Sequence, residues 1–127
     1  MTLLLDTTVL IDVLRNRGNR RAHLAKLVEQ DHFLAISALN LGEVYAGMRP
    51  DEAAQTEAFL ASLECFPVTA PIARRAGSLK FAWQQKGRTL TLADMIVAAT
   101  ALEYSLTLVT DNLRDFPLAE LAFHPLP

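Results

Sequence analysis

Met1-Thr-Leu-Leu-Leu-Asp-Thr-Thr-Val-Leu-Ile11 opens the chain and is the stretch that decides its fold. Three leucines followed directly by Asp6 predict a short buried strand that delivers a carboxylate to its C-terminal end, where the polar Thr7 and Thr8 take over. In open α/β sheets, ligands bind at this edge of the sheet. The opening therefore predicts an α/β fold with a functional site at the end of the first strand.

Short apolar runs alternate with helical segments along the rest of the chain. We expect helices at 9–14, 20–30, 38–48, 52–63, 71–85 and 92–103, and further strands at 33–36, 65–68, 106–109 and 122–124. Each parallel connection needs a crossover, so this alternation predicts a mostly parallel central sheet with helices on both faces, a three-layer α/β/α sandwich. The order of the strands in the sheet does not follow from the alternation.

The length and composition suit one domain spanning residues 1–127. A hydrophobic fraction of 51% argues for strands buried on both faces. The single Cys65 cannot form an internal disulfide, and no Cys/His pair has zinc-site spacing, so a reducing cytoplasm is the expected location. Asp6 interrupts the first apolar run, so we expect neither a signal peptide nor a membrane-spanning segment.

The charge distribution is uneven. A net charge of −2 argues mildly against a nucleic-acid partner. However, no acid lies between Glu64 and Asp94, where five basic residues occur, and five more crowd residues 15–26. Basic helices beside acidic strand ends would suit a polyanion held near a metal, while ordinary solvated helix faces remain the alternative.

Two acids lie in predicted helices close to strand ends. Glu43 follows Gly42, and a glycine inside a helix costs about 1 kcal/mol relative to alanine, which suggests a close approach at that point. A solvent-facing glutamate beside an accidental glycine is the equally weighted alternative. Asp94 lies in the first turn of its helix, where the helix dipole favours an acid for ordinary structural reasons. The small Ala98 and Ala101 on the following turns predict that this helix lies tightly against the sheet.

Further acids follow the strand that ends at Thr110. Asp111, Asn112 and Asp115 lie in a predicted turn, where such side chains are common for local backbone reasons. Carboxylates gathered from all these positions would repel one another unless a cation sat between them. Oxygen ligands alone select Mg²⁺ or Mn²⁺, which would suit phosphodiester hydrolysis through a metal-bound water.

Four segments together resemble PIN-domain nucleases, and specifically VapC-type toxins of bacterial toxin–antitoxin pairs. They are Leu-Asp-Thr-Thr-Val-Leu-Ile-Asp (5–12), Ser-Ala-Leu-Asn-Leu-Gly-Glu-Val-Tyr-Ala-Gly (37–47), Leu-Ala-Asp-Met-Ile-Val-Ala-Ala (92–99) and Leu-Val-Thr-Asp-Asn-Leu-Arg-Asp-Phe (108–116). The resemblance implies a Mg²⁺-dependent endoribonuclease that inhibits translation, with Mn²⁺ as a possible substitute. It also implies a homodimer. Its nuclease activity would be neutralised by a VapB-type antitoxin, whose C-terminal segment would cover a groove on the toxin.

The resemblance further assigns roles to individual residues. The metal-binding acids would be Asp6, Glu43 and Asp94, and we prefer Asp115 over Asp111 as the fourth catalytic acid. The supporting residues would be Thr7 or Thr8, Thr110, Asn112 and Asp111. Contacts to RNA phosphates are expected from Lys86, Arg88 and Arg114, although a solvated-loop role suits each of them equally.

Two other readings compete with a nuclease. A phosphotransferase of the haloacid dehalogenase type needs a second aspartate two residues after the first, and Thr8 occupies that position. A non-catalytic binding module would keep the fold without the chemistry, and the acids at all motif positions argue against it. His23, His32 and His124 are scattered and indicate no catalytic base.

Overall fold

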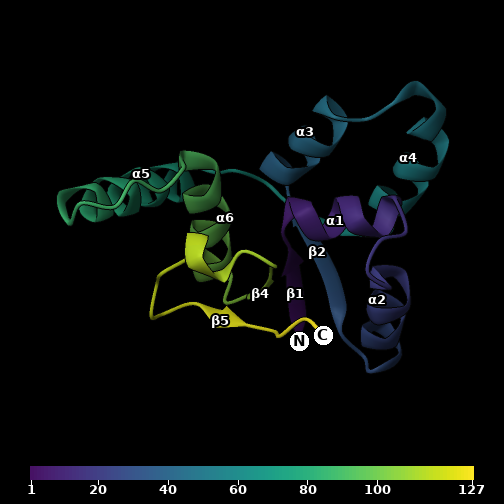
Figure 1. The fold of residues 1–127 in the computed structure, drawn as a ribbon. Coiled ribbons are helices and arrows are strands. Elements are labelled where there is room, and N and C mark those ends of the chain that lie inside the picture. Colours follow the sequence, from purple (N-terminus) through teal and green to yellow (C-terminus); the bar gives the residue numbers. More distant parts are fainter.

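All residues from 1 to 127 are described by the computed structural model (Figure 1). One five-stranded sheet has the order β3-β2-β1-β4-β5, and every pairing in it is parallel. The strands are β1 (Thr2–Leu5), β2 (Phe33–Ser37), β3 (Glu64–Phe66), β4 (Thr107–Val109) and β5 (Ala122–Phe123). Because β1 is central, its C-terminal end lies in the middle of the sheet edge.

Six helices cover the two faces of the sheet. They are α1 (Thr7–Leu14), α2 (Arg20–Glu29), α3 (Ala38–Ala46), α4 (Ala53–Ala61), α5 (Ala70–Gln85) and α6 (Leu92–Glu103), with 3₁₀ turns η1 (Pro50–Glu52) and η2 (Leu113–Asp115). Figure 1 shows α5 and α6 together on one side, and α1, α2 and α4 on the other. The predicted three-layer α/β/α sandwich is confirmed.

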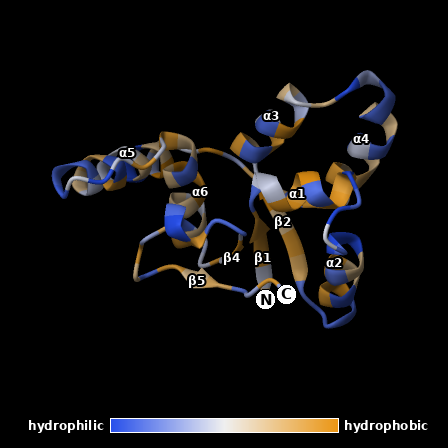
Figure 2. Cartoon of the chain, in the orientation of Figure 1, coloured by the Kyte–Doolittle hydropathy of each residue, from blue (hydrophilic) through white to orange (hydrophobic).

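The core consists of two apolar clusters, one on each face. Alternate residues of β1 point to opposite faces, so Leu3 and Leu5 join the cluster beneath α1, α2 and α4, while Leu4 joins the cluster beneath α5 and α6. Figure 2 shows the resulting hydrophobic character of β1 and β2. The expectation of strands buried on both faces is confirmed for β1, whose three leucines are completely buried.

Several element bounds differ from the predicted ones for identifiable reasons. Helix α1 begins at Thr7 rather than at residue 9, because the Asp6 carboxylate caps it by accepting from Thr7 N–H at 2.9 Å. Strand β3 covers 64–66 rather than 65–68, and it stops before Pro67, which has no N–H to donate. The gap between the helices expected at 9–14 and 20–30 is also present, and within it Asn16, Gly18 and Asn19 have positive φ.

None of the helices combines the length and the apolar character that crossing a membrane requires.

Candidate active site

Asp6 lies at the end of the central strand and is nearly buried, with 6% of its surface exposed. Its Oδ1 accepts from Thr7 N–H at 2.9 Å and its Oδ2 accepts from the Thr110 hydroxyl at 2.8 Å. The Asp6 N–H also donates to Val109 O at 3.0 Å. The ends of β1 and β4 are therefore joined by hydrogen bonds that hold this carboxylate in one orientation.

Glu43 reaches the same edge from α3, which starts there because the Ser37 hydroxyl caps it by accepting from Leu39 N–H at 3.1 Å. The glutamate is exposed, and its Oε1 accepts from the Thr7 hydroxyl at 2.7 Å. Thr8 is exposed, so Thr7 is the threonine that contacts an acid. No other part of the chain makes the close approach expected at Gly42, because a Cβ there would meet no atom beyond its own stretch of helix within 4 Å.

Asp94 projects from the first turn of α6, whose N-terminus is capped by the Thr91 hydroxyl accepting from Asp94 N–H at 3.0 Å. The helix lies tightly in the core, since Ala98 and Ala101 are almost completely buried. The tight contact predicted for this small-residue face is confirmed. The half-buried Asp94 side chain is thus anchored by its helix rather than by a bond to another acid.

Burial raises the pKa of Asp6 above its ordinary value, although the bonds from Thr110 and Thr7 lower it. Glu43 and Asp115 raise it further by charge repulsion. Burial is also the main cause of the raised pKa of Asp94, to which Asp6, Asp115 and Glu43 add repulsion. The carboxylates of Glu43 and Asp115 therefore lie within electrostatic reach of Asp6 and Asp94, whose anionic forms are less stable than they would be in solvent.

Asp111 forms an ion pair with Arg20, which is not part of the acid site. Its Oδ1 accepts from Arg20 Nη2 at 2.6 Å, and Asp12 lies 3.9 Å from Arg20 Nε. The charge of Asp115, and not that of Asp111, acts on the pKa values of Asp6 and Asp94. This geometry favours Asp115 as the fourth acid. Asn112 contributes its backbone N–H, which donates to the Thr110 hydroxyl at 3.0 Å.

The donor set suits a hydrated hard cation. No three His, Cys, Asp or Glu side chains lie close enough to form a ready-made cage around an ion. Magnesium, however, usually takes only one or two carboxylates directly and keeps several waters. Asp6 and Asp94, whose anionic forms are destabilised mainly by burial, would be the candidates for the direct positions, and Glu43 and Asp115 would act through water.

A family model described as PIN domain matches residues 3–123. The chain belongs to the PIN-domain family. This PIN domain is 36% identical over 115 residues to Ribonuclease VapC19 of Mycobacterium tuberculosis, an alignment that covers 91% of this chain and 92% of the relative. The resemblance to VapC-type proteins is therefore confirmed, and it favours the nuclease chemistry over a phosphotransferase.

Solved structures share the fold of this PIN domain. VapBC2 from Rickettsia felis, bound to a DNA fragment from its promoter, superposes with a TM-score of 0.85 at 24% identity and covers 98% of each chain. A toxin–antitoxin complex from Klebsiella pneumoniae superposes with a TM-score of 0.79 at 26% identity, again with 98% of each chain covered. At 24% identity, the similarity to the Rickettsia structure is evidence for the fold only.

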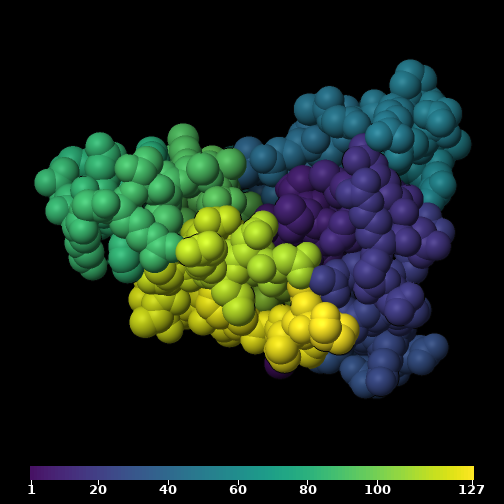
Figure 3. All heavy atoms as spheres, viewed as in Figure 1, coloured from purple at the N-terminus to yellow at the C-terminus, as the bar shows by residue number.

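The basic residues expected to meet RNA lie beside one another at the surface of the PIN domain. The Lys86 Nζ is 4.6 Å from the centre of the Trp83 ring, and the Arg88 guanidinium is 6.0 Å from it. Arg88 also donates to the carbonyl of Arg114, so the loop before α6 is joined to η2. Figure 3 shows these two segments in contact, green against yellow-green. Trp83 itself is half-buried against the core.

Sequence reasoning missed one residue of the site. Asn40 is 1% exposed, and its Nδ2 donates to the Thr7 hydroxyl at 2.7 Å and to Glu43 Oε1 at 3.2 Å. The signal that was present in the sequence is its spacing, since residues three apart on a helix lie on one face. An asparagine three residues before an acid, on a helix that follows a buried strand, therefore faces the same side as that acid.

Proposed function

We propose that this PIN domain is a Mg²⁺-dependent endoribonuclease and the toxin of a toxin–antitoxin pair. The observation that carries the proposal is the electrostatic grouping of Asp6, Glu43, Asp94 and Asp115: burial raises the pKa of Asp6 and Asp94, and repulsion from the neighbouring carboxylates adds to the rise. A bound cation would relieve this repulsion, and a carboxylate-bound Mg²⁺ beside phosphodiester oxygens is suited to hydrolysis. The naming of VapC19 as a ribonuclease supports RNA as the substrate.

The residues of the chain would act in distinct ways. Asp6 and Asp94 would hold the ion, Asp6 in the orientation imposed by Thr7 and Thr110. When bound, Mg²⁺ would supply a polarised water and neutralise phosphate charge. Glu43 has its Oε1 occupied by hydrogen bonds, which leaves Oε2 to accept a proton from the attacking water. Asp115 would orient further waters from η2.

The surface near Trp83 would bind the RNA backbone. Lys86, Arg88 and Arg114 are exposed, so their side chains can meet phosphates without desolvating in the core. The net charge of −2 makes such a local basic surface necessary for a polyanion. Neutralising these residues would weaken binding of RNA of any sequence and reduce its salt dependence.

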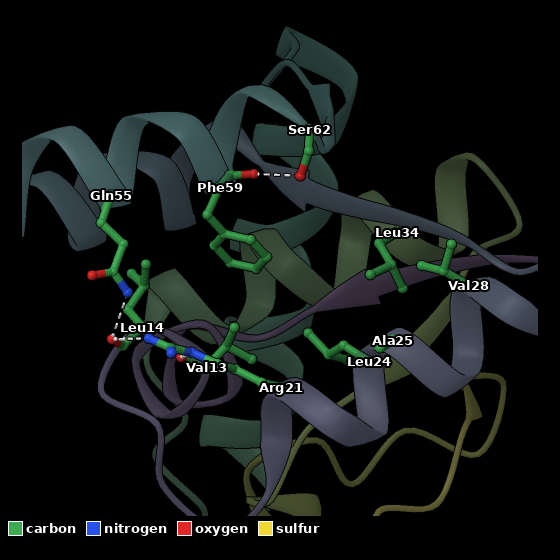
Figure 4. A pocket seen from close by; sticks show the side chains of 10 residues that line it. All are labelled: Val13, Leu14, Arg21, Leu24, Ala25, Val28, Leu34, Gln55, Phe59 and Ser62. Carbon is green, nitrogen blue, oxygen red and sulfur yellow. Dashed lines mark hydrogen bonds between the residues drawn. The ribbon is translucent and has the colours of Figure 1, made fainter.

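A VapB-type antitoxin would be the protein partner, forming a hetero-oligomer with this chain. An apolar cavity of about 310 Å³ between α1, α2, β2 and α4 suits its C-terminal segment (Figure 4). Leu24, Leu34 and Phe59 line it, and Arg21 lies at one end, where it donates to Val13 O at 2.7 Å. The support for a partner comes from the toxin–antitoxin complexes that share this fold. The homodimer and the inhibition of translation stay predictions.

The decisive experiment is cleavage of a mixed cellular RNA pool by purified, antitoxin-free protein, with Mg²⁺ or Mn²⁺ against EDTA. The matched variant is Asp94→Asn, which keeps the side-chain shape. Metal-dependent cutting that vanishes in the variant supports the nuclease. If folded, metal-loaded protein cuts nothing, the proposal fails in favour of the non-catalytic binding module.

A further inference from the structure

A closed set of hydrogen bonds ties α3 to the first residue of α1. The amide Nδ2 of Asn40 donates to the Thr7 hydroxyl at 2.7 Å and to Glu43 Oε1 at 3.2 Å. The Thr7 hydroxyl in turn donates to the same Glu43 Oε1 at 2.7 Å. Both amide hydrogens of Asn40 are thus committed to groups that belong to the acid site.

The carbonyl oxygen of the Asn40 side chain reduces the stability of the fold. This atom, Oδ1, is buried and accepts no hydrogen bond. A buried polar atom without a partner lowers the free energy of unfolding, whereas an apolar side chain of similar size at this position would avoid the penalty. An apolar residue would fill this position in the core at less cost than an asparagine. The presence of asparagine is therefore explained by the two hydrogen bonds that its Nδ2 donates.

Glu43 is the group that gains from this arrangement. Its side chain is exposed and has three rotatable bonds, so solvent alone would let the carboxylate adopt many orientations. Two donors on Oε1 hold one orientation and leave Oε2 without a protein partner. Only Asn40 contacts both Thr7 and Glu43 from within the core.

We propose that Asn40 is a positioning residue of the active site, which orients Glu43 through the shared Thr7 hydroxyl and keeps Glu43 Oε2 directed to solvent and ligand. The proposal rests on the nuclease function, since it assigns Asn40 a part in that reaction. Asn40 touches no reacting atom itself and acts only through Thr7 and Glu43.

The test compares Asn40→Leu and Asn40→Asp with the wild type. Both variants lose the two N–H donors, but Asn40→Asp keeps the side-chain shape, so a loss common to both is not due to a cavity or to crowding. We expect kcat for RNA cleavage to fall about 10- to 100-fold, as for other groups that orient a metal site, while KM for RNA is unchanged. The metal-free Asn40→Leu protein should unfold at the wild-type temperature or above it.

Thr100→Val is the matched control. The Thr100 hydroxyl is also buried, but it donates within α6 to Ile96 O at 2.7 Å. Its removal should leave kcat unchanged. Wild-type kcat in either Asn40 variant overturns the proposal, and so does a loss of activity that merely follows a lower unfolding temperature. Wild-type and Asp94→Asn assays run in parallel report separately on the nuclease function.

A second readout needs no cleavage. In metal-free protein, the Asn40 side-chain amide hydrogens should exchange slowly with solvent, as measured by NMR, because both are buried and bonded. Glu43→Ala should speed this exchange by removing one acceptor. Fast exchange in the wild type, or exchange indifferent to Glu43→Ala, would show that the hydrogen bonds do not persist in solution and would overturn the positioning role.

Discussion

The acid cluster (Asp6, Glu43, Asp94 and Asp115) and the histidine cluster (His23, His32 and His124) both gather like side chains from distant parts of the chain. The His124 ring centre lies 6.3 Å from that of His23 and 5.6 Å from that of His32. Burial raises the pKa of Asp6 and Asp94. The same cause, followed by the charges of His124, Arg20 and Lys26, lowers the pKa of His23.

The neutral form is favoured at Asp6 and Asp94 in one cluster and at His23 in the other, but the consequences differ. A lowered pKa leaves His23 uncharged near neutral pH, so it needs no counter-ion. A carboxylate remains an anion at that pH unless its pKa rises by several units, so the acid cluster stores repulsion that a cation relieves. The comparison shows that clustering alone does not make a metal site, because the charge state at neutral pH decides which cluster requires a ligand.

The largest expected effect is on RNA cleavage, which should require the acid cluster and not the histidine cluster. Asp94→Asn or Asp6→Asn should reduce RNA cleavage at least about 100-fold, since a direct ligand position is lost. The metal-free variants should unfold at the wild-type temperature or slightly above it, because one repelling charge is gone. His124→Gln should cleave as the wild type does. Unfolding of both aspartate variants would contradict the catalytic assignment.

The gain in stability on Mg²⁺ binding should also depend on the acid cluster and not on the histidine cluster. Mg²⁺ at about 100 times its dissociation constant should raise the free energy of unfolding by about 2.7 kcal/mol, measured by denaturation with and without EDTA. Asp94→Asn should abolish most of this gain, and His23→Gln should keep it. A gain that survived Asp94→Asn would place the ion outside the acid cluster.

Arg20 lies near the histidine cluster and outside the acid cluster, since its charge helps to lower the pKa of His23 and it pairs with Asp111 at 2.6 Å. Arg20→Met should cost about 2 kcal/mol in chemical denaturation, less than a fully buried pair because Asp111 is partly exposed. The pKa of His23 should rise toward its ordinary value in an NMR titration. Arg15→Met, which breaks the more exposed contact to Glu52 at 3.7 Å, is the control and should cost under about 1 kcal/mol.

The smallest effect is in the pH dependence of metal-free stability. Because the pKa values of Asp6 and Asp94 are raised by folding, the folded protein binds protons at a higher pH than the unfolded chain does. The free energy of unfolding should therefore rise as the pH falls from the raised pKa values toward 3.8. The lowered pKa of His23 acts oppositely, and stability should be lost as pH falls below 6.5 toward the folded value. His23→Gln should flatten the slope below pH 6.5, as measured by unfolding at each pH. An unchanged slope would mean that His23 titrates alike in both states.

Sequence reasoning reached the local features of the site. The run from Leu3 to Leu5 and the capping positions at Ser37 and Thr91 are set by neighbours within a few residues, so the strand and the starts of α3 and α6 were predictable. It did not reach Asn40, because an asparagine on a helix is ordinary until its partner 33 residues away is known.

The remaining differences have the same origin. Asp111 and Asp115 are equivalent in a local turn, and they are distinguished by the pairing of Asp111 with Arg20, 91 residues away, and by the action of the Asp115 charge on Asp6 and Asp94. The three histidines gave no signal in the chain, because His124 lies about a hundred residues from His23 and only the tertiary fold brings their rings to 6.3 Å. Gly42 marks no contact within the chain, since the space next to it is open.

By itself, the sequence determined the α/β class, the parallel sheet and the placement of four acids in the segments that follow strands. These follow from hydrophobic periodicity and capping, which act over a few residues. Only the tertiary structure decided the strand order, the hydrogen bonds of Asn40, the pairing of Asp111 and the field that the acids share. Hydrogen bonds and charge interactions depend on distances of a few ångströms, and between residues far apart in the chain the completed fold sets those distances.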